Sequence, residues 1–165
     1  MLHTLTQGLS EHFLHLAPLV SRHSLKIAPE KLKIGLLTKL LSLVLAEQVK
    51  SDELLFLHNK WVGICVDDIG LRFEVSFYGQ LLVRTFQQPN VTFCANVPEL
   101  ILVAAGKEDP DTLFFQRKLR IEGDTELGLE VKNLLLSIEL DTLPKSAQFV
   151  VEKLALITQT LQPTS

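Results

Sequence analysis

Apolar residues recur along this chain with two periods, one typical of helices and one typical of strands. In the first 18 residues they follow helical spacing, and Pro18 marks the end of the stripe. Residues 21–28 then form a basic connector. We therefore expect residues 1–28 to form an N-terminal unit, an amphipathic helix with its connector, and residues 29–165 to form the main domain. The helix is expected either to pack on that domain or to lie on lipid.

A long helix is predicted from Glu30 to Lys50, directly after Pro29. Its apolar residues cover a face that is wider than the stripe of an ordinary surface helix. The members of this face are Leu32, Ile34, Leu36, Leu37, Leu40, Leu41, Leu43, Val44 and Leu45. Such a face indicates a helix that is buried on two sides or that forms one wall of a cavity.

Four short strands separated by turn signals are predicted next. In the clearest of them Leu71, Phe73 and Val75 alternate with polar residues. The predicted strands cover residues 61–66, 71–78, 81–86 and 91–95. Because the turns between them are short, we expect an antiparallel meander whose apolar face is covered by helices.

The stretch from Asp109 to Ile138 is the most informative part of the chain. Asp109 precedes Pro110 and a further acid, so a short helix is predicted to begin there. Residues 119–122 alternate as a fifth strand, and Asp124 is placed to cap the next helix. That helix carries an apolar stripe of Leu127, Val131, Leu134, Leu135 and Ile138.

Two more helices complete the predicted architecture. One follows Pro98 over residues 99–105, and the other runs from Pro144 to about Leu161. The order of these elements predicts an α+β fold, with one mostly antiparallel five-stranded sheet and helices on one of its faces.

The composition is unusually apolar. Hydrophobic residues make up 47% of the chain, 34 of the 165 residues are leucine, and the mean hydropathy is +0.25. No apolar run reaches the roughly 20 residues that span a bilayer. The excess indicates either a tightly packed core with an oligomer interface, or a cavity or exposed face that holds something apolar. No leader is recognisable, so we expect a cytoplasmic protein with two buried thiols, Cys65 and Cys94.

Charge is distributed unevenly. Residues 1–50 carry six Lys and Arg against three acids, whereas the remainder carries ten against sixteen. Four of the five histidines lie in the first 23 residues. A basic, amphipathic front end is compatible with peripheral contact with an anionic inner-membrane surface. The basic residues are too sparse for a nucleic-acid site.

Catalytic signatures are absent from the sequence. It has no dinucleotide or phosphate-binding glycine motif, no nucleophile elbow and no zinc-protease motif. His12 and His15 share a helix face, but two ligands without further partners make a poor metal site. We therefore expect no enzymatic activity, no cofactor and no metal.

Charged residues between positions 109 and 126 have two interpretations. The acids Asp109, Asp111, Asp124 and Glu126 could form a carboxylate cluster, but their positions at helix starts favour capping. The basic residues Arg117, Lys118 and Arg120 either grip an anionic headgroup or form a solvated strand edge.

Two motifs in this stretch point to a family. DPDTLFFQR at residues 109–117 and IEGDTELGLEVKN at residues 121–133 resemble bacterial lipid carriers of the sterol carrier protein type 2 family. The wider pattern covers roughly residues 40–140 of the main domain. The resemblance implies a sterol-carrier-like sheet and helices around an apolar tunnel.

The resemblance also implies a function. It is that of a non-enzymatic accessory factor in oxygen-independent ubiquinone biosynthesis, which binds prenylated quinone precursors or membrane lipid. Hydroxylases of the UbiU and UbiV type would be its partners. The alternatives are a scaffold of a quinone-biosynthesis complex and a general phospholipid carrier.

Nine apolar residues are predicted to line the lipid site. They are Leu102, Phe114, Phe115, Leu127, Val131, Leu134, Leu135, Val150 and Leu154. A flexible aliphatic wall suits a flexible tail, because few polar groups are needed to anchor the head.

Overall fold

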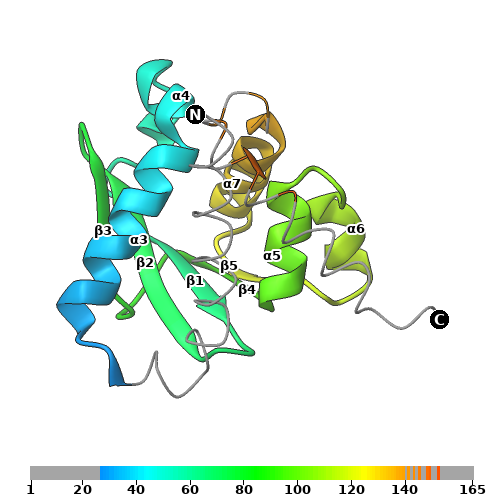
Figure 1. The fold of residues 1–165 in the computed structure, drawn as a ribbon, viewed down its shortest axis with the longest axis horizontal. Helices are drawn as coiled ribbons and strands as arrows, with labels where there is room; N and C mark the ends of the chain where they lie inside the picture. The colour runs from blue at the N-terminus through cyan, green and yellow to red at the C-terminus, as the bar shows by residue number, and fades with distance from the viewer. Residues whose placement is uncertain are drawn as a thin grey trace, which may run out of the picture.

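The computed structural model describes residues 27–139, together with residues 141, 143, 145, 148, 149 and 152. Its centre is a five-stranded sheet in the order β3-β2-β1-β4-β5. The strands are β1 (Val62–Val66), β2 (Leu71–Phe77), β3 (Leu81–Thr85), β4 (Val91–Ala95) and β5 (Arg120–Gly123). The helices gather on one face of this sheet (Figure 1). The predicted α+β fold with five strands is therefore confirmed.

The predicted meander is wrong at its fourth strand. β4 does not pair with β3 but lies parallel to β1, with Val62 opposite Val91. The other three strand pairs are antiparallel, so the sheet is mixed. The chain between β3 and β4 crosses the sheet at Gly63, where a Cβ atom would lie 2.7 Å from Pro89 Cγ. Asn90 then fixes the start of β4, because its Oδ1 accepts from the Trp61 amide at 2.7 Å.

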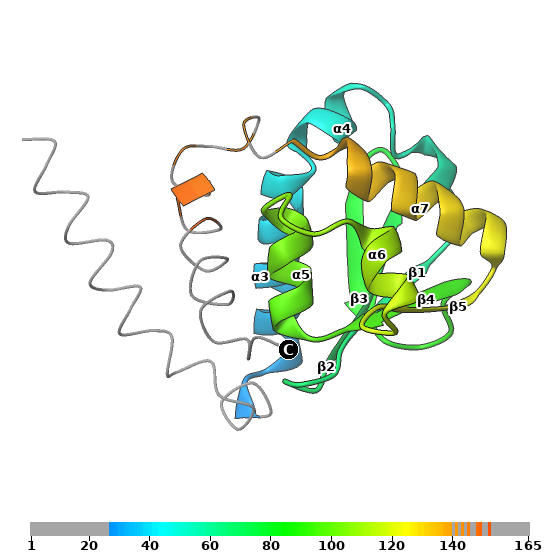
Figure 2. The same cartoon turned by 90° about the vertical axis from the view of Figure 1, so that its right-hand side faces the viewer.

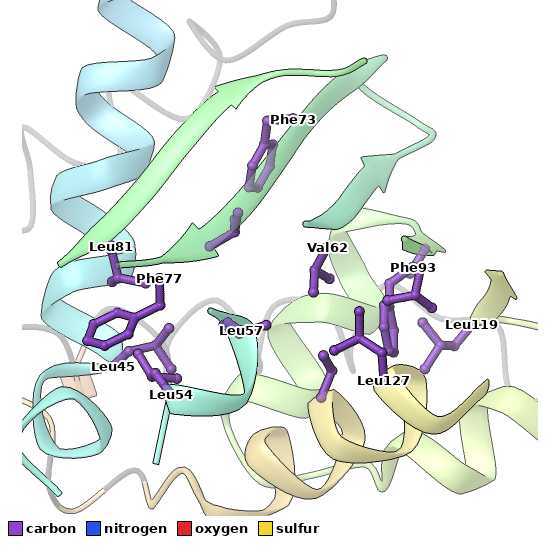
Figure 3. Packing of buried hydrophobic residues seen from close by; sticks show 14 of the residues in the cluster. Leu45, Leu54, Leu57, Val62, Phe73, Phe77, Leu81, Phe93, Leu119 and Leu127 are labelled. Carbon is purple, nitrogen blue, oxygen red and sulfur yellow. The ribbon is translucent and has the colours of Figure 1, made fainter. Parts of the chain in front are cut away.

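The predicted helix from Glu30 to Lys50 is divided. It consists of α3 (Glu30–Val44) and α4 (Ala46–Lys50), and Leu45 between them leaves helical geometry. The break places the Leu45 side chain in the core. Figure 3 shows Leu45 and Leu54 beside Phe77 and Leu81 of the β2–β3 hairpin. Helix α3 itself lies along β3.

The remaining helices are η2 (Leu55–Leu57), α5 (Val97–Ala104), α6 (Pro110–Phe115) and α7 (Thr125–Ser137). The predicted caps are confirmed: Asp109 accepts from the Asp111 amide, and Asp124 accepts from the amides of Glu126 and Leu127. Helix α5 is capped from a distance by Asp68 in the β1–β2 turn, which accepts from the Val97 amide at 3.1 Å. Asp109 and Asp124 therefore cap the helices that they precede, as their positions in the sequence predict.

The core lies between the sheet and the helices. Side chains at alternate strand positions, such as Phe73 and Val75 or Val91 and Phe93, point to the helix-covered face. Helix α7 contributes Leu127, which is 1% exposed and lies beside Phe93 (Figure 3). Figure 2 shows α5, α6 and α7 packed over this face.

Several predicted features lie outside the described residues. They are the N-terminal helix with His12 and His15, and most of the final helix from Pro144 to about Leu161. Among the residues that the structure describes, no helix is both long enough and apolar enough to cross a membrane.

Candidate functional site

An apolar cavity of about 190 Å³ lies between the helices and the sheet. Its walls come from the end of α3, from β1 and β4, and from α5, α6 and α7. The lining residues are Val44, Ile64, Phe93, Ala95, Glu99, Leu100, Val103, Ala104, Pro110, Leu113, Leu119, Val131, Leu135, Ile138 and Leu143. Glu99 is the one charged residue among these described lining residues.

The local sequence explains why these side chains converge. Phe93 and Ala95 are two positions apart on β4, so they share the helix-covered face of the sheet. Val131 and Leu135 are four residues apart, so they share one face of α7, and Ile138 follows as the residue at its C-terminal end. The cavity is therefore the space that remains where the apolar stripe of α7 and helix α5 meet the sheet.

Two of the nine predicted lining residues, Val131 and Leu135, lie on the cavity wall. Leu134, one position away on α7, instead lines a shallow surface hollow with Glu53 and Phe56. Leu127 is buried in the main core, and Leu102 is buried in a small separate cluster with Ala105. Leu134, Leu127 and Leu102 therefore pack against residues away from the cavity.

Phe114 and Phe115, which were predicted to line the lipid site, are not among the residues that line this cavity. Their exposed fractions are 43% and 81%, and their rings meet edge to face with centroids 5.8 Å apart. Leu113 takes the inward position of α6 and is 2% exposed. Consecutive residues point about 100° apart around a helix, so the two rings after Leu113 turn outward. Val150 and Leu154, the last two predicted residues, fall outside the described part of the chain.

Sequence reasoning missed most of the cavity wall. The positions of Ile64, Phe93 and Ala95 at alternate places in their strands could have indicated that they share one face of the sheet. Another signal was Glu99, a single acid in a helix that is otherwise apolar. Neither pattern indicates which helix lies over which strand, because the parallel pairing of β1 and β4 decides that arrangement.

A polar hollow adjoins the cavity. Its lining residues are Asp67, Cys94, Ala95, Asn96, Glu99, Arg117, Lys118 and Arg120. Arg120 Nη2 donates to Asp67 Oδ2 at 2.8 Å, and this carboxylate raises the pKa of the Arg120 guanidinium. Arg117 and Lys118 form no ion pair with any described residue. The three basic residues of this segment therefore share one solvent-facing hollow, and of the three only Arg120 forms an ion pair with a described residue.

The described residues of this region provide apolar surface, buried thiols and one carboxylate at the cavity. Cys65 and Cys94 are buried free thiols. In the described part of the chain no group of three or more His, Cys, Asp or Glu is placed to hold a metal ion. An apolar cavity with one carboxylate at its edge can enclose a hydrocarbon group and offer one acceptor to its polar end.

Comparison with known families agrees with this geometry. A model described as the SCP-2 sterol transfer family matches residues 37–136. The chain belongs to the SCP-2 sterol transfer family. Its SCP-2 domain thus includes β1 to β5 and most of the cavity wall, and the resemblance seen in residues 109–133 is confirmed.

Relatives within the SCP-2 family include proteins of ubiquinone synthesis. The ubiquinone biosynthesis accessory factor UbiT of Escherichia coli K12 is 43% identical over 148 residues, which are 89% of this chain and 85% of that protein. The UbiT of E. coli O157:H7 has the same identity and the same coverage. The solved structure of the UbiJ-SCP2 ubiquinone synthesis protein is 16% identical, with a TM-score of 0.52 over 66% of this chain and 97% of that one. The latter likeness supports the SCP-2 fold alone.

Proposed function

We propose that this protein is a non-enzymatic lipid-binding accessory factor of ubiquinone biosynthesis. The observation that carries the proposal is the apolar cavity between α5, α7 and the sheet, in a chain 43% identical to the accessory factor UbiT. The ligand is a prenylated quinone precursor or a membrane lipid. Its tail enters the cavity, and the protein presents its head to partner hydroxylases of the UbiU and UbiV type in the pathway that needs no oxygen.

The energetics of a prenyl tail support a carrier. Burying each methylene is worth about 0.8 kcal/mol, so a long tail resists transfer to water by on the order of ten kcal/mol. An enzyme away from the membrane therefore meets such a substrate only through a carrier. The cavity of about 190 Å³ compares with the roughly 150 Å³ that holds benzene in an engineered protein. It suits the part of the molecule next to the head, and a longer tail requires the helices to part.

The surface beside the cavity supports loading from a membrane. Phe115 is exposed on α6, and the exposed cations Arg117 and Lys118 follow it after Gln116. Exposed rings beside basic residues are suited to binding an anionic bilayer, because the rings insert into the interface and the cations pair with the headgroups. We propose that α6 faces the membrane during loading, in addition to any contact made by the N-terminal segment.

The pathway assignment has its own test. Cells that lack this protein and grow without oxygen should contain less ubiquinone than complemented cells, whereas cells grown with oxygen should not differ. Complementation with Ala104→Phe, which fills the cavity, should fail. Unchanged quinone content without oxygen would contradict the assignment.

A second candidate function is a scaffold that holds biosynthetic enzymes together. The observation in its favour is the outward row of Leu32, Leu36 and Leu40 on α3, whose exposed fractions are 64%, 67% and 54%. A scaffold would keep its partners when the cavity is filled by Ala104→Phe and lose them when Leu36→Ser breaks the row. Co-purification of both variants separates this function from lipid carriage.

A further inference from the structure

Glu99 occupies an unusual position between two kinds of surface. It lines the apolar cavity and also the polar hollow with Arg117 and Lys118. Ala95 is the only other residue shared by both sets of described lining residues. The cavity and the hollow therefore meet at Glu99, with hydrocarbon on one side and solvent-facing cations on the other.

One oxygen of the Glu99 carboxylate has no hydrogen-bond partner among the described residues. Its Oε2 is buried and accepts no hydrogen bond from any residue that the structure describes. Buried acceptors are paired in the great majority of cases, so an unpaired one calls for an explanation. Helix capping does not provide it, because Asp68 already accepts from the first amide of α5. The first turn of a helix favours an acid, but it does not require a buried oxygen without a donor.

A ligand of the proposed carrier would supply that donor. We propose that Glu99 anchors the head of the bound lipid by accepting a hydrogen bond from a hydroxyl group, with the apolar tail beside Val103 and Leu135. This inference rests on the proposed lipid-carrier function and names the ligand class, a long-tailed amphiphile with a hydroxylated head. The head then lies at the edge of the polar hollow, where solvent and a partner can reach it.

The geometry distinguishes this role from that of the neighbouring cations. Arg117, Lys118 and Arg120 are exposed and carry donors, so they cannot satisfy a ligand hydroxyl as acceptors. Asp67 is occupied by Arg120 at 2.8 Å. Among the carboxylates of the described hollow, Glu99 is thus the acceptor available to the cavity.

Two matched probes test the anchor. A long-chain alkylphenol and its O-methyl ether have nearly the same tail, but only the phenol can donate a hydrogen bond. Wild-type protein should bind the phenol at least about tenfold more tightly, as a hydrogen bond to a charged group allows. Glu99→Leu should bind both probes equally, and Glu99→Gln should show a reduced preference. Glu126→Gln is the control, because Glu126 lies in the first turn of α7 but is exposed.

The outcomes separate the anchor from the carrier function. The anchor would be overturned if folded Glu99→Leu still preferred the phenol to the ether. It would also be overturned if wild-type protein bound both probes with equal affinity. Either outcome would leave the carrier proposal intact. Failure of wild-type protein to bind either probe would overturn both. Thermal unfolding checks the variants, and the Tm of Glu99→Leu should not fall, because the substitution removes an unpaired buried oxygen.

Discussion

Cys65 and Cys94 lie opposite one another on the parallel strands β1 and β4. Both are buried, and Arg72 Nε donates to Cys65 Sγ at 3.4 Å. Burial, followed by a hydrogen bond to Cys65, raises the pKa of the Cys94 thiol to about 11. Both cysteines are thus largely buried, and Cys94, at the edge of the polar hollow, is a neutral thiol at physiological pH.

The raised pKa of Cys94 predicts that alkali destabilises the fold. Between about pH 9 and about pH 11 the unfolded chain releases this proton while the folded chain keeps it, so the free energy of unfolding falls as pH rises. The loss should be on the order of 2 kcal/mol. Urea unfolding at a series of pH values should show this loss of stability in wild-type protein and a smaller loss in Cys94→Ala. Parallel pH profiles for the two proteins would contradict the prediction.

Asp124 predicts a stability effect that is local to α7. Its Oδ1 accepts from the amides of Glu126 and Leu127, both at 3.0 Å. Asp124→Ala should lower the free energy of unfolding by about 1 kcal/mol, because two amides at the helix start lose their acceptor. Asp124→Asn keeps the acceptor and should retain most of the stability. Equal losses of stability in the two variants would show that the negative charge of Asp124, and not its hydrogen bonds to the helix amides, stabilises α7.

Filling the cavity should reduce lipid binding without unfolding the protein. Ala104 lines the cavity, and Ala104→Phe would place a ring in the space proposed for the tail. Displacing two or three methylenes should weaken binding by about 2 kcal/mol, roughly thirtyfold. Fluorescent fatty-acid displacement measures this change. Leu129→Phe on the exposed side of α7 is the control and should bind as wild type does.

The exposed ring of Phe115 predicts a membrane phenotype. Phe115→Ser should change the free energy of unfolding by less than about 0.5 kcal/mol, because the side chain is 81% exposed. Co-sedimentation with vesicles of anionic phospholipid should nevertheless fall. Tyr78→Ser is the control, because Tyr78 is also an exposed ring but follows β2 in the other half of the sheet. Equal effects of the two substitutions would argue against α6 as the contact.

Local chemistry made much of the fold predictable. The caps at Asp109 and Asp124 and the stripe of α7 each depend on neighbouring residues, and the structure has them. The alternation in β2 does not mark a half-buried strand, because Glu74 and Ser76 are buried as well. The crossing to β4 depends on the close fit of Pro89 over Gly63. That fit joins residues far apart in the chain, so turn signals could not reveal it.

The candidate site was less predictable than the fold for the same reason. Periodicity identifies Leu127 and Val131 as inward residues, but it cannot tell which of them faces filled core and which faces a cavity. Phe114 and Phe115 suggested a lining as two large rings side by side on a short helix. The shortness of α6 and the burial of Leu113 turned them outward.

The central claim is that the cavity carries a lipid. Solvent extraction of the purified full-length protein, followed by mass spectrometry, tests this claim most directly when wild-type protein is compared with Ala104→Phe. We expect a prenylated quinone precursor or a membrane lipid in the wild-type extract and a strongly reduced amount in the Ala104→Phe extract. Wild-type protein that repeatedly yields no lipid, and that takes up none when mixed with lipid vesicles, would contradict it.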